Sequence, residues 1–205
     1  MSVKPLLDFI GKIEGRSDYN IVWGGIKAKD WPPKHLTTMT IREVLAWQDK
    51  IDPRYMSEAA GVYQILEDTL RDLYAEAGLT LDDLFDRAGQ DALAVQLLKR
   101  RGLKKFLAGQ MSVNDFCNNL AMEWASLPVV SGPKTGQSYY GGDGLNKSLV
   151  SVKAFTDVVS SIRPSIPNPR PEPAKEPEPA PRVDVFAIIA AAIRLLFSNL
   201  FGGKK

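Results

Sequence analysis

The sequence predicts an α+β fold that is predominantly α-helical, with a small β-hairpin lobe, a proline-rich linker and a C-terminal hydrophobic helix. Apolar residues recur at helical spacing through most of the first 162 residues, as is typical of helices that bury one face. A short β-rich segment ends in two glycines, and prolines become frequent from residue 163. We therefore expect a globular domain over residues 1–162, a linker over residues 163–182 and a separate helix over residues 183–201.

The helices are predicted from apolar stripes and from the residues that begin and end them. The first helix carries a stripe formed by Leu6, Leu7, Ile10 and Ile13. Gly15 offers a stop for this helix. Further helices are expected from Ser57 to before Gly78, over residues 90–101, from Ser112 until Pro128, and over residues 145–162. One more helix is expected to start at Thr80, with Asp83 as its capping partner.

Two stretches do not have a helical pattern. Residues 19–23 are rich in β-forming side chains and are followed by Gly24 and Gly25, which predicts a hairpin directly after the first helix. Residues 138–144 are rich in glycine and are expected to form a loop. This loop lacks the lysine and hydroxyl residue that end a phosphate-binding loop, so it is not interpreted as one.

Composition excludes several classes of function. Of the 205 residues, 44% are hydrophobic and 24% are charged, and the net charge of +2 argues against a dedicated nucleic-acid-binding protein. Cys117 is the single cysteine, so no disulfide can form within the chain, and we expect it to pack. His35 is the single histidine and is expected on a surface loop. A zinc site of the usual ligands is disfavoured, and we expect a monomer without metal or organic cofactor.

The last 40 residues have a composition of their own. Residues 163–182 carry a proline every two or three positions, which favours an extended spacer. Residues 183–201 are almost wholly apolar, with Arg194 within the run and Lys204 and Lys205 after it. We expect this segment to associate with membrane lipid, either spanning the bilayer or lying in its interface. The alternative is a helix that docks on the domain or self-associates.

Glu14 is the candidate catalytic residue. It lies four residues after Ile10 and seven after Leu7, which places its carboxyl on the apolar face of the first helix. A carboxyl among apolar groups loses hydration, so its pKa rises and it can act as a general acid near neutral pH. The alternative is a solvated glutamate at a helix end.

The order of several motifs resembles the phage lambda lysozyme family. The matching elements keep the order of that family and are residues 13–15 (IEG), 19–25 (YNIVWGG), 60–66 (AGVYQIL), 90–94 (QDALA), 99–103 (KRRGL) and 118–128 (NNLAMEWASLP). The resemblance implies a lysozyme-like fold, the glycan strands of peptidoglycan as substrate, and Glu14 as the catalytic acid. It also implies a phage or prophage enzyme that is made in the bacterial cytoplasm and acts on the cell wall. We find no cleavable signal at the N-terminus.

The missing second carboxylate indicates the type of reaction. A hydrolytic glycosidase uses two carboxylates, whereas the position where hydrolytic phage lysozymes of another type carry an aspartate is Trp23 here. The resemblance instead implies a lytic transglycosylase, in which Glu14 alone serves as acid and base and the product is a 1,6-anhydro sugar. Two alternatives stay open: a hydrolase that uses Asp18 or Asp30, and a glycan-binding module without activity.

The same resemblance suggests residues that contact the substrate. Tyr63 and Gln64 match a pair that lines the cleft of the family, and Gly61 would allow a sugar to approach closely. Asn20 stands where the family often has an aspartate. Trp23, Tyr139 and the neighbouring Tyr140 are candidates for stacking on sugars. Each of these aromatic residues has packing in the core or in a loop as its alternative.

Overall fold

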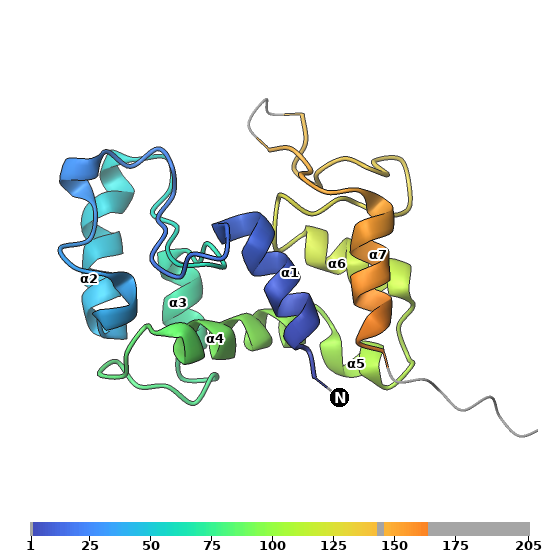
Figure 1. Cartoon of the computed structure of the whole chain (residues 1–205), viewed down its shortest axis with the longest axis horizontal. Coiled ribbons are helices and arrows are strands. Elements are labelled where there is room, and N and C mark those ends of the chain that lie inside the picture. Colours follow the sequence, from blue (N-terminus) through green and yellow to red (C-terminus); the bar gives the residue numbers. More distant parts are fainter. Residues whose placement is uncertain (1, 143–145, 164–205) are drawn as a thin grey trace, which may run out of the picture. The chain divides into compact units, whose positions relative to one another are not determined.

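The computed structural model describes residues 2–142 and 146–163, which form seven α-helices joined by turns and loops (Figure 1). The helices are α1 (Lys4–Gly15), α2 (Ile41–Ile51), α3 (Glu67–Leu73), α4 (Arg87–Arg100), α5 (Leu103–Leu107), α6 (Val113–Ala121) and α7 (Val152–Ser161). Short 3-10 helices cover Ala28–Asp30, Leu36–Thr38 and Asp52–Arg54. The predicted linker after Arg163 and the predicted hydrophobic helix lie outside the described residues.

The helices form two groups joined by α4 (Figure 1). On one side, α2 packs against α3; on the other, α7 contacts both α1 and α6, and α5 contacts α6. The bridging helix α4 contacts α3 in the first group and α1 in the second. One continuous hydrophobic core runs through the described domain, and Cys117 is buried in it as predicted. No helix within the described ranges combines the length and the apolar character needed to cross a bilayer.

Helix α1 forms where the sequence predicted it. Pro5 stands in its first turn, where its missing N–H costs no hydrogen bond. Leu6 and Ile10 are fully buried on the inward face. The helix ends at Gly15 because Arg16 adopts a left-handed conformation with φ of 52°. This end is important because it carries Glu14.

Three further predicted helices are present, with boundaries set by their caps. Helix α4 begins three residues before the predicted start at residue 90, because the Asp86 side chain caps it by accepting from Gly89 N–H at 2.9 Å. Ser112 caps helix α6 as predicted, but this helix ends at Ala121 rather than near Pro128. The last helix begins only after Ser151, whose hydroxyl accepts from Ala154 N–H. The prediction of a helix from residue 145 was therefore too long over residues 146–151.

The predicted helix from Ser57 was wrong over residues 57–66. Gly61 and Gln64 adopt positive φ angles of 74° and 51°, which interrupt any right-handed helix. Ala60 instead pairs with Ile65 across a tight turn and with Val22 from the segment after α1. Only the second half of the prediction forms a helix, which is α3.

The predicted helix from Thr80 was also wrong. Asp83 does accept hydrogen bonds from the Thr80 N–H and hydroxyl, at 2.7 and 2.8 Å, but no helix follows. The backbone carbonyls of Leu81 and Asp83 instead accept from Arg42 and Ile41, each at 2.9 Å. Ile41 and Arg42 are the first residues of α2, so hydrogen bonds to another helix replace those that a helix from Thr80 would form within itself.

The predicted hairpin at Gly24–Gly25 is not formed within the described residues, where β pairing is limited to isolated bridges. Trp23 N–H donates to Ala59 O at 2.9 Å, so this segment pairs with residues beyond α2 rather than with the chain after Gly25. Ile26 N–H folds back onto Trp23 O, and a 3-10 helix starts at Ala28. The glycine-rich loop is present over residues 138–142.

Candidate active site

Glu14 lies in the last turn of α1 with its carboxyl half-buried. The Ser126 hydroxyl donates a hydrogen bond to Glu14 Oε1. Ser126 is itself buried and belongs to the turn that follows α6. The contact therefore joins the end of the first helix to a segment 112 residues further along the chain.

The surroundings of Glu14 favour its protonated form. Burial raises the pKa of the Glu14 carboxyl above its ordinary value, and hydrogen bonds from Ser126 lower it by less. The carboxyl also lies at the carbonyl end of α1, where the helix dipole disfavours a negative charge. The prediction of a carboxyl that loses hydration on the apolar side of the helix agrees with this environment.

Gly15 fixes the end of α1 against the rest of the domain. A Cβ at this position would lie 2.5 Å from Val62 Cα, so only glycine permits the approach. Val62 N–H in turn donates to Gln90 Oε1 at 2.9 Å. Gln90 is fully buried, and its amide donates to Tyr19 O and Phe85 O, each at 2.9 Å. The turn around Val62 is thus clamped between α1 and α4.

Ser126 is held by its own neighbours. The Trp124 indole N–H donates to Tyr63 O at 3.1 Å, which ties this turn to the same segment that Gly15 contacts. Leu149 N–H donates to Ser126 O at 2.9 Å from the other side. Sequence reasoning placed Trp124 in the apolar stripe of a helix and assigned no role at the site to Trp124 or Ser126, although both stand in one of the matched motifs. No sequence spacing relates them to Glu14, so only the fold could reveal the contact.

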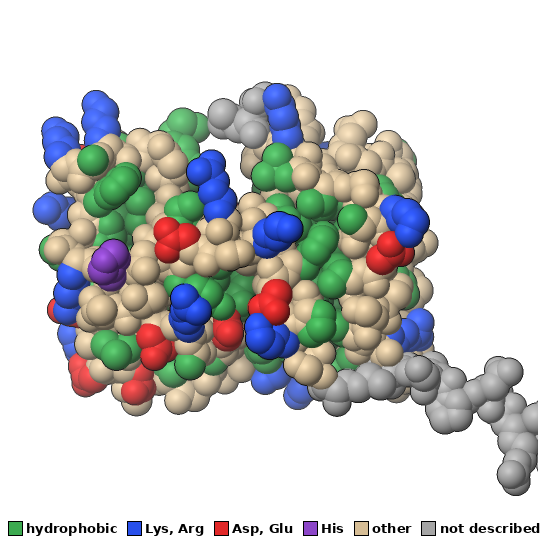
Figure 2. All heavy atoms as spheres, in the orientation of Figure 1, with side chains coloured by type: hydrophobic (Ala, Val, Ile, Leu, Met, Phe, Trp, Pro, Cys, Tyr) green, Lys and Arg blue, Asp and Glu red, His purple; other side chains and the backbone are tan. Residues whose placement is uncertain are grey.

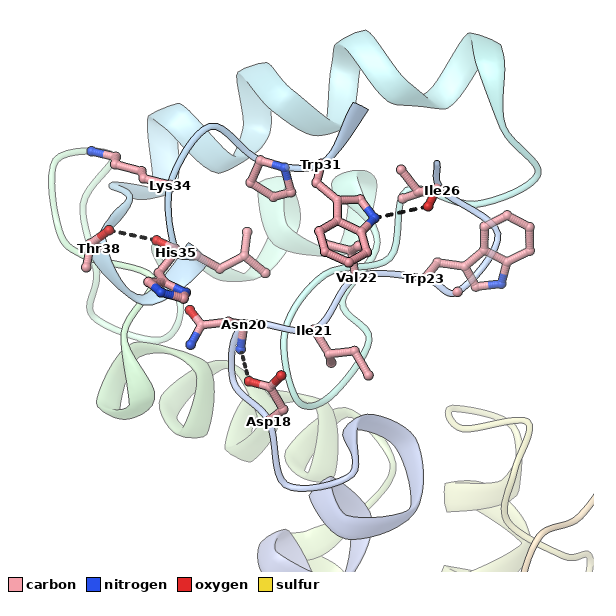
Figure 3. A pocket seen from close by; sticks show the side chains of 13 residues that line it. Asp18, Asn20, Ile21, Val22, Trp23, Ile26, Trp31, Lys34, His35 and Thr38 are labelled. Atoms are coloured by element: carbon pink, nitrogen blue, oxygen red, sulfur yellow. Dashed lines mark hydrogen bonds between the residues drawn. The ribbon is translucent and has the colours of Figure 1, made fainter. Parts of the chain in front are cut away.

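A groove of about 580 Å³ begins where the chain leaves α1 (Figure 3). Asp18, whose N–H donates to Gly15 O at 2.7 Å, stands on its wall. The wall is mainly apolar, with a few polar groups, and is formed by Asp18, Asn20, Ile21, Val22, Trp23, Gly24, Ile26, Trp31, Pro32, Lys34, His35, Leu36 and Thr38. Glu14 is not one of these residues, but the groove leads to the turn that follows it.

Two of the predicted substrate-binding residues, Asn20 and Trp23, lie in this groove (Figure 3). Asn20 Oδ1 accepts from both the N–H and the hydroxyl of Thr37 at 3.0 Å, so its carbonyl is used within the protein. Trp23 is half-exposed, and a Cβ at Gly25 would overlap its ring, since even Cε3 would lie only 2.6 Å away. Gly25 therefore makes room for the indole. His35 is exposed in a loop, as predicted.

Three predicted residues lie in the turn behind the groove. Tyr63 is only 2% exposed, and its hydroxyl donates to Asp91 at 2.6 Å, so the structure places it in the core. Burial also raises the pKa of Tyr63, which keeps the phenol protonated. A Cβ at Gly61 would lie 2.7 Å from Gln90 Cδ, which means that protein atoms occupy the space beside it. Gln64 is half-buried and bonds Gly61 O at 3.0 Å.

The remaining candidates lie apart. Tyr139 is 39% exposed on the loop before residue 143 and stacks edge-on against Tyr140. Asp18 is exposed and accepts from Asn20 N–H at 2.8 Å. Asp30 accepts from Tyr55 at 2.6 Å and from Arg54 at 3.0 Å, and these contacts hold the pKa of its carboxyl below the usual range. Of the two aspartates, only Asp18 lines the groove.

Comparison with known proteins identifies the family of this chain. A family model described as Endolysin matches residues 16–152, and it begins two residues after Glu14. No curated protein and no solved structure matches the chain. Because the family match covers more than half of the chain, the protein belongs to the endolysin family, whose members are phage enzymes that degrade the peptidoglycan of the bacterial cell wall.

Proposed function

We propose that this endolysin cleaves the β-1,4 bond between N-acetylmuramic acid and N-acetylglucosamine by lytic transglycosylation, with Glu14 as the catalytic acid and base. The observation that carries the proposal is the half-buried Glu14 carboxyl with its raised pKa, held by Ser126 at the end of α1. The family of the chain supports peptidoglycan as the substrate. In this role the protein would open the wall during phage lysis.

The chemistry needs only one carboxyl. Protonated Glu14 gives its proton to the glycosidic oxygen as the bond to the anomeric carbon of muramic acid breaks. The resulting carboxylate then takes the proton of the C6 hydroxyl of the same sugar, while that oxygen bonds to the anomeric carbon. The product is a 1,6-anhydro sugar, no water is consumed, and Glu14 is again protonated. Burial and the Ser126 hydroxyl oppose each other, which suits a group that must both give and take a proton.

The groove supports a place for the glycan strand. Its apolar wall and the face of Trp23 offer contacts to sugar rings, and Asn20 offers its amide N–H groups to polar substituents. Gln64 and Gly61 are proposed to influence the reacting sugar through the turn that supports Glu14. Tyr139 is proposed to contact the strand further along, since its ring is exposed.

A hydrolytic muramidase is the second candidate, because Asp18 is exposed and lines the groove close to the α1 end. Asp30 is less suited than Asp18 to serve as the second catalytic carboxylate, since its oxygens already accept hydrogen bonds from Arg54 and Tyr55. A module that binds glycan without cleaving it is the third. The hydrolase predicts reducing ends in place of anhydro ends, and the binding module predicts no cleavage product.

Digestion of purified sacculi followed by mass spectrometry tests the proposal. We expect 1,6-anhydromuramic ends, which are lighter by one water than reducing ends. The Glu14→Gln variant keeps the shape of the side chain and should be slower by roughly 10²–10⁴-fold. Asp18→Asn is the matched variant, and it should leave the anhydro product dominant. Reducing ends as the main product, lost on Asp18→Asn, would show a hydrolase; no cleavage by the wild type would show a binding module.

A further inference from the structure

Trp31 is an exposed indole between two hollows of the domain. It lines the groove described above and also a second hollow of about 530 Å³. The residue is 57% exposed, yet its indole N–H donates to Ile26 O at 3.0 Å (Figure 3). Because that bond fixes the ring and satisfies its polar atom, Trp31 offers only its apolar faces to a ligand.

The second hollow, which we call the Trp31 hollow, lies beside α2. Its lining consists of Lys29, Asp30, Trp31, Pro33, Met39, Glu43, Ala46, Trp47, Lys50 and Ile51. Met39, Trp47 and Ile51 are buried and form an apolar floor. The Trp47 N–H donates to Asp30 O at 3.0 Å, so the floor presents no unsatisfied donor from this ring.

The lining of the Trp31 hollow carries two lysines and two carboxylates, but both carboxylates are paired with cations from outside the lining. Glu43 forms an ion pair with Lys34 at 2.9 Å and also caps α2, while Asp30 is neutralised by Arg54 at 3.0 Å. Lys29 and Lys50 are exposed and form no ion pair with the described residues. Figure 2 shows Lys and Arg side chains along the edge of the molecule where α2 lies. The hollow therefore fits a ligand with apolar groups and free carboxylates.

The substrate of an endolysin carries such a group. Each muramic acid bears a lactyl ether from which a short stem peptide extends, and this peptide combines small methyl-bearing residues with free carboxylates. A strand in the groove would direct a stem peptide to one side, and Trp31 separates that groove from the Trp31 hollow. We propose that the Trp31 hollow binds the acidic stem peptide, with Trp31 packing against its apolar part and with Lys29 and Lys50 attracting its carboxylates.

This inference rests on the proposed function, because it takes a glycan strand in the neighbouring groove as its starting point. It makes the enzyme selective for strands that still carry peptides. Strands from which an amidase has removed the peptides would bind through the groove alone. Selectivity should also weaken with salt, since Lys29 and Lys50 are exposed and their attraction is screened.

The test compares cleavage of peptide-bearing and amidase-stripped glycan by the full chain. We expect kcat/KM to be roughly three- to thirty-fold higher on the peptide-bearing strands, as two partly exposed ion pairs would give. The double variant Lys29→Gln with Lys50→Gln should lose this preference while cleaving stripped strands at the wild-type rate. Lys99→Gln with Lys105→Gln removes the same charge elsewhere and should keep the preference.

Two results would overturn the proposal: equal kcat/KM of the wild type on both substrates, or an unchanged preference in the Lys29 and Lys50 double variant. Failure of the proposed function looks different: a hydrolase would still cleave both substrates but would leave reducing ends, and a binding module would cleave neither. In that event, calorimetry with soluble muramyl peptide still decides the matter. Binding to the wild type that the double variant lacks, and that falls with salt, supports the Trp31 hollow as the peptide site; no binding refutes it.

Discussion

Gly15→Ala is the substitution that most directly tests how the fold positions Glu14. A Cβ at residue 15 would lie 2.5 Å from Val62 Cα and 2.8 Å from Val62 C, whereas ordinary contact starts at 3.4 Å. Both atoms belong to the backbone, and Gln90 holds the neighbouring N–H at 2.9 Å. The added methyl therefore cannot be accommodated by a side-chain rotation, and the end of α1 must move away by roughly 1 Å.

The two expected effects differ in size. Overpacking costs about 1–3 kcal/mol of stability, but alanine favours a helix over glycine by about 1 kcal/mol, so the net loss should be about 0–2 kcal/mol. Activity should suffer more, because Glu14 is the preceding residue and would be drawn away from Ser126. A misplacement of roughly 1 Å at a reacting group can cost about 10²-fold in rate. We expect that loss in kcat, with KM little changed.

Gly11→Ala provides the matched control on the same helix. A Cβ there would lie 3.0 Å from Val62 Cγ2, which belongs to a side chain that can shift by a few tenths of an ångström. Release of soluble muropeptides at saturating substrate measures kcat, and urea unfolding measures stability. Gly11→Ala should remain within a few-fold of wild-type activity. A Gly15→Ala protein with wild-type kcat would refute the view that this contact sets the position of Glu14.

Three other predictions concern Ser126, Glu14 and the C-terminal segment. Ser126→Ala removes a hydrogen-bond donor that favours the Glu14 carboxylate, so the pKa of Glu14 should rise. The alkaline limb of the pH–rate profile should then move to higher pH. A limb that moves to lower pH would contradict a hydrogen bond from Ser126 to Glu14. Because the folded-state pKa of Glu14 is raised, its protonated form stabilises the fold below the ordinary value of 4.5, and this contribution is lost as pH rises through the folded-state pKa. Glu14→Gln should therefore gain stability relative to wild type between pH 4 and pH 8 in urea unfolding, and a constant difference would argue against burial. Residues 183–201 should carry the full chain to the top of a liposome flotation gradient, whereas a chain ending at Ile162 should stay behind; equal flotation would exclude a membrane role for this segment.

Sequence patterns predicted the helices that depend on local signals. The apolar stripe of α1 with its glycine stop, and the Ser112 cap of α6, are complete within a few residues. Helix α2 was missed, although Thr40 and Glu43 form a reciprocal capping box at its start, with bonds of 2.8 and 3.2 Å. The segments that were wrong, such as residues 57–66, contain good helix formers whose backbone is captured by distant partners. Long-range hydrogen bonds of this kind leave no period in the sequence.

In the candidate site, too, local features could be predicted from the sequence, whereas contacts between distant residues could not. The half-buried position of Glu14 at the end of α1 could be predicted because its distance from Ile10 and the glycine after it are both local features. Tyr63 was expected near the substrate from the motif around it, but its phenol bonds Asp91, 28 residues away. Ser126 could not be related to Glu14 by any spacing. The Trp31 hollow depends on how the chain after Gly25 turns into a 3-10 helix, where the sequence predicted a hairpin.

The arrangement around Glu14 gives a physical reason for placing the proposed catalytic group on a helix end and not in the groove itself. A carboxyl that lines an open groove keeps its hydration and ionises near its ordinary pKa. Such a carboxyl has lost its proton at neutral pH and cannot act there as a general acid. At the end of α1 the carboxyl is half-buried, and one hydroxyl, that of Ser126, compensates part of the lost hydration. Trp124 anchors that hydroxyl to the turn that Gly15 contacts, so the acid and its hydrogen-bond donor rest on the same support. The hydrogen bond between Glu14 and Ser126 therefore depends on the position of that one turn, which both groups contact through their neighbours.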